Sequence, residues 1–293
     1  MMTNSRIELF IRLAFSAGSF LMVLLVTRHF NLGFTPDSIE YYDVAKSLLN
    51  GQGIVDSQGH FVNHWPPLYS AFVAFIAWGS TLSVHASAII LSAICIATLN
   101  YGFLLLMSSV NKNILVQVLL CLFLNSLIFS TLFTTFLSEG LFLTEVMLLS
   151  LHLRAYSDKK NFSYFLGFGV LGGLMFLTRY AAIGIIGGGV LFFLYQTVQK
   201  KDWRGSLVNL ALISLGFVVT VFPWIAYSFN KADSVAHRDA GFHLINFTQL
   251  SQTLDTLLFW INPTESTLIL IGLSACSLAL IWILKPWSSR GLR

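Results

Sequence analysis

Nine long apolar segments follow one another along this 293-residue chain, and they restrict its fold more than any other feature. A helix that crosses a membrane needs about 20 mainly apolar residues. Charged residues make up 10% of the chain, against about 25% of a typical soluble domain. We therefore predict an all-α, polytopic membrane protein. The first segment follows Arg6 and Arg12 and runs to Val26, and the others lie near residues 66–84, 86–108, 113–136, 140–155, 162–178, 181–198, 206–228 and 266–284.

The segment at residues 66–84 decides how many of the nine cross the membrane. It begins with two prolines, contains Trp78-Gly79-Ser80-Thr81 and is barely long enough to span. If it lies in the outer interface, or dips into it as a re-entrant hairpin, 12 of the 17 Lys and Arg residues fall on the inner side, as the positive-inside rule expects. This assignment predicts about eight transmembrane helices, with both termini inside and two outer loops at residues 29–85 and 229–265.

The same topology divides the chain and its charges. Residues 1–265 form the predicted membrane core of seven spans and their outer loops, and residues 266–293 form an eighth span with a basic cytoplasmic tail. The basic residues are scattered in short loops and form no patch, so we expect no nucleic-acid partner. Nine of the 13 acidic residues lie at the outer face, namely Asp37, Glu40, Asp43, Asp56, Glu139, Asp233, Asp239, Asp255 and Glu265.

The first outer loop opens with a predicted amphipathic helix. Thr35 is a good cap, Pro36 suits the first helical position, and Gly51 and Gly53 end the helical pattern. Apolar residues at helical spacing, namely Ile39, Tyr42, Ala45, Leu48 and Leu49, face away from Asp37, Glu40, Asp43 and Lys46. Such a helix lies on a membrane surface. Trp65 and Tyr69, beside Pro66-Pro67, are typical interface anchors.

Two features inside the predicted spans also constrain the packing. Glu145 lies two turns into the fourth span, where an acid normally has a partner, and Arg179 is one candidate. The pairs Gly169-x-x-x-Gly173 and Gly184-x-x-x-Gly188 predict close packing between the fifth and sixth spans.

Several short motifs together carry a family resemblance. They are Thr35-Pro36-Asp37-Ser38 with Tyr41-Tyr42 and Gly51-x-Gly53, then Trp65-Pro66-Pro67-Leu68-Tyr69, Ser138-Glu139, Leu177-Thr178-Arg179-Tyr180 and Phe222-Pro223-Trp224. In this order they resemble the GT-C clan of integral-membrane glycosyltransferases, in particular the bacterial relatives of protein O-mannosyltransferases and the aminoarabinose transferase. The resemblance implies a polyprenyl-phosphate sugar donor, a lipid, glycan or protein acceptor, and the bacterial inner membrane. It also implies a first-loop and a second-loop acid, which match Asp37 and Glu139.

The chemistry of such a transfer assigns roles to these residues. An acceptor hydroxyl must lose its proton while a phosphate leaves, which requires a carboxylate base and a nearby cation. We predict Asp37 as the base and Arg179 as the partner of the carrier phosphate. Glu139 orients the acceptor or, with Asp37, holds a divalent cation such as Mg or Mn. Substrate contacts are expected from a further four residues, Glu40, Tyr41, Tyr42 and His64.

Other hypotheses remain open on the sequence alone. Asp37 and Glu139 could simply cap their helices, and Arg179 could extend its head group to the interface. Members of the GT-C clan usually carry more spans than this chain, so a truncated, non-catalytic protein that binds lipid or a partner is the main alternative. A lipid transporter is a weaker one, because the acids gather at one face rather than near the membrane midplane.

Overall fold

The computed structural model describes residues 4–126, 130–155, 162–200, 203–232 and 246–261. These residues are mainly helical, and β-structure among them is limited to two isolated bridges, Gly33 with Thr135 and Val55 with Phe61. The predicted all-α class is confirmed. The helices are α1 (Asn4–Phe30), α2 (Pro36–Leu49), α3 (Leu68–Ser80), α4 (Val84–Val110), α5 (Ile114–Leu124), α7 (Glu139–Arg154), α8 (Phe162–Thr178), α9 (Ala182–Lys200), α10 (Trp203–Ala232) and α11 (Phe247–Ile261).

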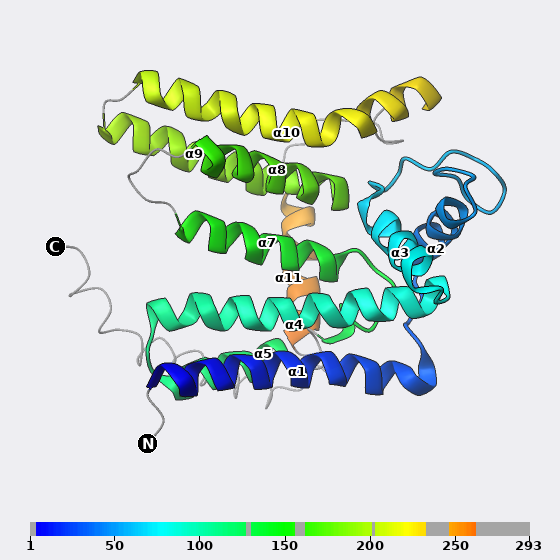
Figure 1. Ribbon diagram of the computed structural model, residues 1–293, viewed down its shortest axis with the longest axis horizontal. Coiled ribbons are helices and arrows are strands. Elements are labelled where there is room, and N and C mark those ends of the chain that lie inside the picture. The colour runs from blue at the N-terminus through cyan, green and yellow to red at the C-terminus, as the bar shows by residue number, and fades with distance from the viewer. Residues whose placement is uncertain (1–3, 127–129, 156–161, 201–202, 233–245, 262–293) are drawn as a thin grey trace. The chain divides into compact units, whose positions relative to one another are not determined.

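The chain divides into two compact units, Met1–Arg238 and Asp239–Arg293, and α11 is the helix described in the second. In the first unit, the long helices lie side by side (Figure 1). α1 packs against α4, α4 against α7, α7 against α8, and α8 against α10, while α9 contacts both α8 and α10.

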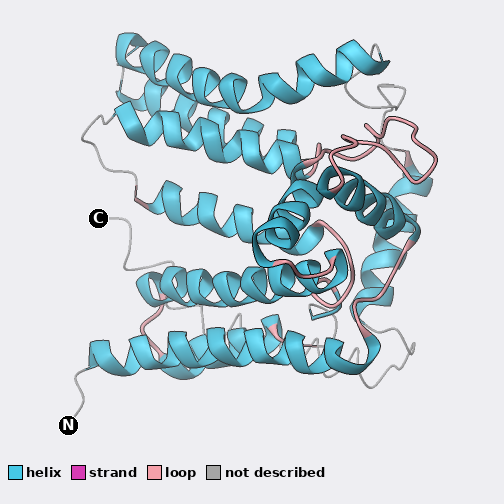
Figure 2. Ribbon diagram, turned by 45° about the vertical axis from the view of Figure 1, so that its right-hand side comes forward, coloured by secondary structure: helices cyan, strands magenta, loops and turns pink. Residues whose placement is uncertain are grey.

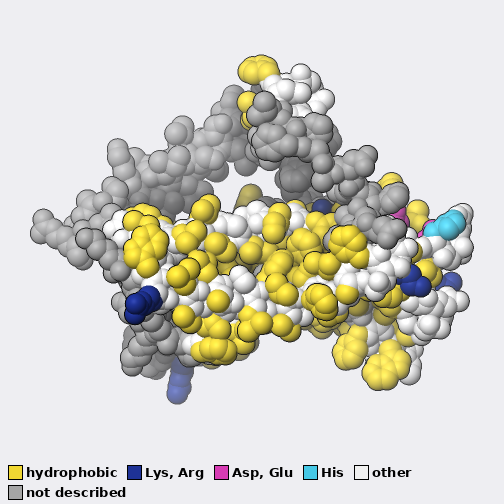
Figure 3. Space-filling model, turned by 90° about the horizontal axis from the view of Figure 1, so that it is seen from above, with side chains coloured by type: hydrophobic (Ala, Val, Ile, Leu, Met, Phe, Trp, Pro, Cys, Tyr) yellow, Lys and Arg dark blue, Asp and Glu magenta, His cyan; other side chains and the backbone are white. Residues whose placement is uncertain are grey.

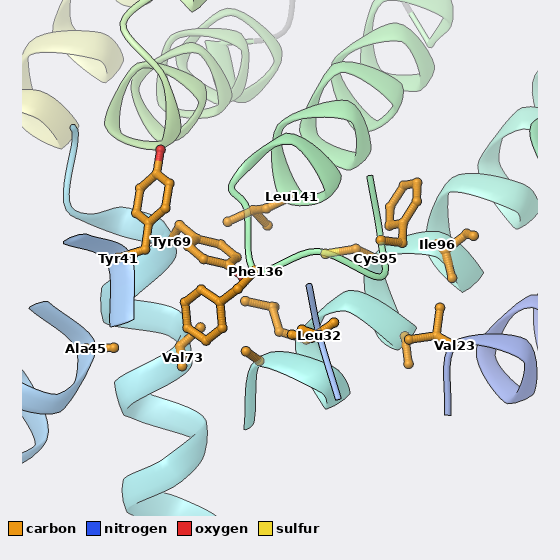
Figure 4. Packing of buried hydrophobic residues seen from close by; sticks show 14 of the residues in the cluster. Val23, Leu32, Tyr41, Ala45, Tyr69, Val73, Cys95, Ile96, Phe136 and Leu141 are labelled. Atoms are coloured by element: carbon orange, nitrogen blue, oxygen red, sulfur yellow. The ribbon is translucent and has the colours of Figure 1, made fainter. Parts of the chain in front are cut away.

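The short helices α2 and α3 pack together at one end of these long helices (Figures 1 and 2). α1 and α8 finish at this end, and α4 and α7 begin there. Residues far apart in the sequence are thereby brought together. Figure 4 shows the buried cluster at this end, in which Tyr41 of α2, Tyr69 of α3 and Phe136 lie close together.

Four helical segments are long and apolar enough to cross a membrane: Arg6–Phe30, Val84–Val110, Ala182–Gln199 and Trp203–Ala232. Hydrophobic side chains also cover much of the face seen in Figure 3, with Lys and Arg towards its two ends. A soluble protein would bury such surface. These are the features of an integral membrane protein.

Other predicted spans differ from the structure in length. α7 and α8 coincide with the predicted spans at 140–155 and 162–178, but they have 16 and 17 residues. The predicted span at 113–136 is not one continuous helix, because α5 ends at Leu124. The predicted eighth span, at 266–284, lies outside the described residues.

An amide pair explains where α5 stops. The Asn125 side chain donates to the Cys121 carbonyl at 2.7 Å and to Oδ1 of Asn100 at 2.9 Å, and the Asn100 amide donates back at 3.3 Å. An asparagine that bonds the backbone in this way competes with helical hydrogen bonds. Further along, the chain leaves the helical conformation and pairs Gly33 with residues 134–136.

The first outer loop begins as predicted. Thr35 and Ser38 form a capping box at the start of α2, Pro36 is the first helical residue, and Gly51 follows the helix with φ +72°. The buried face differs in part from the expected one: Tyr41, Val44 and Ala45 are buried, whereas Ile39 is 56% exposed. The proposed hairpin segment contains α3, a helix of 13 residues.

Glycines set the contact between α8 and α10. A Cβ added at Gly169 would lie 2.1 Å from the Ile213 carbonyl oxygen, and one at Gly216 would lie 2.4 Å from the Leu166 carbonyl oxygen. Only glycine permits two backbones to approach so closely. The predicted partner was wrong, because these α8 glycines face α10 rather than α9. A Cβ at Gly184 or Gly188 of α9 would meet nothing within 4 Å.

Candidate active site

An ion pair between Arg179 and Glu139 forms the centre of the candidate site. Glu139 is the first residue of α7, and Arg179 follows the last residue of α8, so the packing of α7 on α8 brings them together. Arg179 Nη1 lies 2.5 Å from Glu139 Oε1, and it also donates to Ser138 Oγ at 3.3 Å. The guanidinium carbon lies 5.7 Å from the centre of the Trp65 ring, which is a cation–π distance.

Tyr41 connects this ion pair to α2. Its hydroxyl is hydrogen-bonded to Ser138 Oγ at 2.8 Å, and its side chain is 2% exposed. Burial raises the pKa of Tyr41 above its usual range, the Ser138 hydrogen bond and Arg179 oppose this rise, and the negative charges of Glu139 and Asp37 add to it. All three charged groups therefore act on one phenol. Because Tyr41 is buried, its place is behind the site rather than on a surface that an acceptor could touch.

Asp37 lies in the first turn of α2 and is half-buried. Thr35 and Ser38 supply the helix cap, so capping does not engage the Asp37 carboxylate. Within the described part of the chain, Asp37 makes no hydrogen bond or ion pair. The structure thus places a carboxylate without a partner within electrostatic reach of the same tyrosine as the Glu139–Arg179 pair.

Three other predicted substrate contacts surround this centre. Glu40 lines a small cavity of about 10 Å³ next to Tyr41 and Trp65, which is room for about one water molecule, and its Oε2 is buried without a partner. Tyr42 packs edge-on against Phe34 and Phe136, with ring centres 5.9 and 6.0 Å away. His64 packs edge-on against Trp65 at 4.8 Å.

Sequence reasoning missed several residues that hold the site. Ser138 joins Tyr41 to Arg179, and Trp65, expected only as an interface anchor, lies under the guanidinium. Trp224 Nε1 donates to the Tyr180 hydroxyl at 3.2 Å, and that hydroxyl donates to the Asn63 carbonyl at 3.1 Å. The motifs that contain these residues were visible in the sequence, but their partners were not.

The partner suggested for Glu145 was wrong. Arg179 pairs with Glu139, whereas Glu145 Oε1 lies within hydrogen-bond distance of Thr178 Oγ1, at 2.9 Å. The described residues contain no group of three or more His, Cys, Asp and Glu side chains placed to hold a metal ion. Asp37 and Glu139 could supply oxygen ligands, but one Glu139 oxygen is already paired with a cation.

Comparisons with known proteins add no assignment. No protein-family model matches the sequence, and neither the curated proteins nor the solved structures give a match.

Proposed function

We propose that this protein is a membrane glycosyltransferase, of the kind that the GT-C resemblance implies. It would transfer a sugar from a polyprenyl-phosphate donor to a lipid, glycan or protein hydroxyl at the outer face of a bacterial inner membrane. The observation that carries the proposal is the carboxylate of Asp37, which has no partner among the described residues and acts electrostatically on Tyr41, the tyrosine that Ser138 joins to Arg179.

Asp37 is the proposed general base. It accepts the proton of the acceptor hydroxyl as the oxygen forms a bond to the anomeric carbon of the sugar. The bond from that carbon to the carrier phosphate breaks, and its electron pair leaves with the polyprenyl phosphate. The N-terminus of α2 favours a negative charge at this position, and the lack of a competing partner leaves the carboxylate available.

Arg179 is the proposed partner of the carrier phosphate. Its Nη1 group is engaged by Glu139 and Ser138, while a guanidinium carries five N–H donors in all. The side chain is 23% exposed, so the other donors can reach a phosphate. Glu139 and Trp65 then act as positioning residues that fix the direction of the guanidinium.

The same arrangement supports one alternative, a non-catalytic lipid-binding or scaffold protein. The charge of Arg179 is already balanced by Glu139, and the cavity beside Glu40 has room for only about one water molecule. A protein that only binds a lipid phosphate would need Arg179 but not Asp37. The two hypotheses therefore differ in whether the function of the protein requires Asp37.

The decisive experiment measures sugar transfer from a polyprenyl-phosphate donor in reconstituted membranes. Asp37→Asn keeps the size of the side chain but removes the base, so transfer should fall by about 10²- to 10⁴-fold while the protein inserts normally. Asp56→Asn is the matched control, because Asp56 lies in the same loop and, among the described residues, bonds only its own turn. Full activity of Asp37→Asn would refute the base assignment, and an inactive wild type would favour the scaffold.

A divalent cation is the alternative to a free Asp37 base. Asp37 and Glu139 would then hold the ion, which would supply positive charge to the leaving phosphate. Dialysis against a chelator, followed by addition of Mg or Mn, should abolish and restore transfer. Unchanged transfer after chelation would assign phosphate binding to Arg179 alone.

A further inference from the structure

Glu145 lies in the interior of the helical unit with one oxygen partnered and one not. Its side chain is 6% exposed, Oε1 contacts Thr178 Oγ1 at 2.9 Å, and Oε2 is buried without a hydrogen-bond partner. A charged carboxylate left in this way would lack compensation for its lost hydration. A neutral carboxylic acid avoids most of that cost.

The hydrogen bonds of Thr178 also favour a neutral Glu145. Thr178 is fully buried, and its hydroxyl has two acceptors within reach, Glu145 Oε1 at 2.9 Å and the Leu174 carbonyl at 3.1 Å. A threonine hydroxyl has one proton and two acceptor lone pairs. Shared between two acceptors, that proton makes two weakened bonds, whereas both contacts are full hydrogen bonds when Thr178 donates to Leu174 and a protonated Glu145 donates to Thr178.

The position of this pair connects it to the candidate site. Thr178 is the last residue of α8, and the next residue is Arg179, whose guanidinium pairs with Glu139 at the start of α7. Glu145 belongs to α7 as well. The two contacts therefore join α7 to consecutive residues at the end of α8, Thr178 and Arg179.

We infer that Glu145 is a neutral carboxylic acid that donates a hydrogen bond to Thr178 and so holds Arg179 opposite Glu139. It is a positioning residue rather than a catalytic one. The importance of this contact for sugar transfer rests on the proposed function, but the contact itself does not.

Infrared spectroscopy of the full-length protein in lipid tests the state of Glu145. The difference spectrum between wild type and Glu145→Gln, near neutral pH, should contain the carbonyl stretch of a protonated carboxylic acid. A difference confined to carboxylate bands would overturn the inference. This measurement needs no donor and no activity, so it stands whether or not the protein transfers sugar.

Double-mutant cycles on reversible unfolding test the positioning role. Thr178→Val and Glu145→Leu should each raise the equilibrium constant for unfolding by about threefold, with no further rise when combined, because they remove one shared hydrogen bond. Glu145→Gln and Thr178→Ser should restore it, since a neutral amide can donate and serine keeps the hydroxyl. In the Thr178→Val background, the coupling between Arg179→Ala and Glu139→Gln should shrink. An unchanged coupling, or a Glu145→Gln protein as weak as Glu145→Leu, would overturn the role.

Discussion

Replacing Gly169 by alanine should destabilise the protein by forcing α8 and α10 apart. The new Cβ would lie 2.1 Å from the Ile213 carbonyl oxygen, whereas real Cβ atoms essentially never come closer than 3.0 Å to such an atom. The obstructing atom is backbone, so no side-chain rotation relieves the contact, and the helices must separate by about 1 Å. Overpacking of this kind typically costs about 1–3 kcal/mol. Because α8 leads directly to Arg179, sugar transfer should fall as well.

Reversible unfolding in detergent micelles measures this cost. Gly184→Ala is the matched control, because it makes the same change in a helix where a Cβ meets nothing within 4 Å. Alanine is favoured over glycine in helices by about 1 kcal/mol, so this control should be neutral or more stable. Gly216→Ala, with a Cβ 2.4 Å from the Leu166 carbonyl oxygen, should behave like Gly169→Ala. Equal stability of Gly169→Ala and Gly184→Ala would refute the close α8–α10 contact.

Three further predictions follow from the site and the topology. Arg179→Ala should weaken binding of a polyprenyl-phosphate sugar by about 10-fold or more, as expected for a lost charge-assisted hydrogen bond, and equal donor binding by titration would contradict this. Burial raises the pKa of Tyr41, so the neutral phenol stabilises the folded protein fully below pH 10.0, and this stabilisation is lost as the pH rises further. The free energy of unfolding, measured with denaturant at several alkaline pH values, should therefore fall less in Tyr41→Phe than in the wild type. Tags at residues 55 and 240 should be accessible from outside, and tags at 158, 202 and 293 from inside; labelling of residue 158 from outside would mean that residues 66–84 span the membrane.

Local signals explain what could be predicted from the sequence. The start of α2 follows from Thr35, Pro36 and Ser38, which act on neighbouring backbone groups. The end of α2 before Gly51 follows from an equally short-range pattern. Hydropathy located the long helices α1, α4, α9 and α10, because a span of apolar residues is itself the signal.

Contacts between distant residues explain the rest. The end of α5 depends on Asn125 meeting Asn100 of α4, and no pattern within residues 113–136 contains that information. The glycines of α8 indicated a close contact, but a glycine motif does not identify the helix that it faces. For the same reason, the contacts of Arg179 with Ser138 and Trp65 were not foreseen.

The geometry gives Arg179 and Asp37 opposite surroundings, and this contrast bears on the chemistry. Arg179 is held by Glu139, Ser138 and Trp65, which come from two separate segments of the chain, so its direction is fixed before a ligand arrives. A fixed cation suits the stabilisation of charge that develops on a leaving phosphate. Asp37 has no comparable partner among the described residues, and its helix cap is supplied by other residues. A group that must accept a proton needs an open position, and the cap formed by Thr35 and Ser38 leaves the Asp37 carboxylate in one.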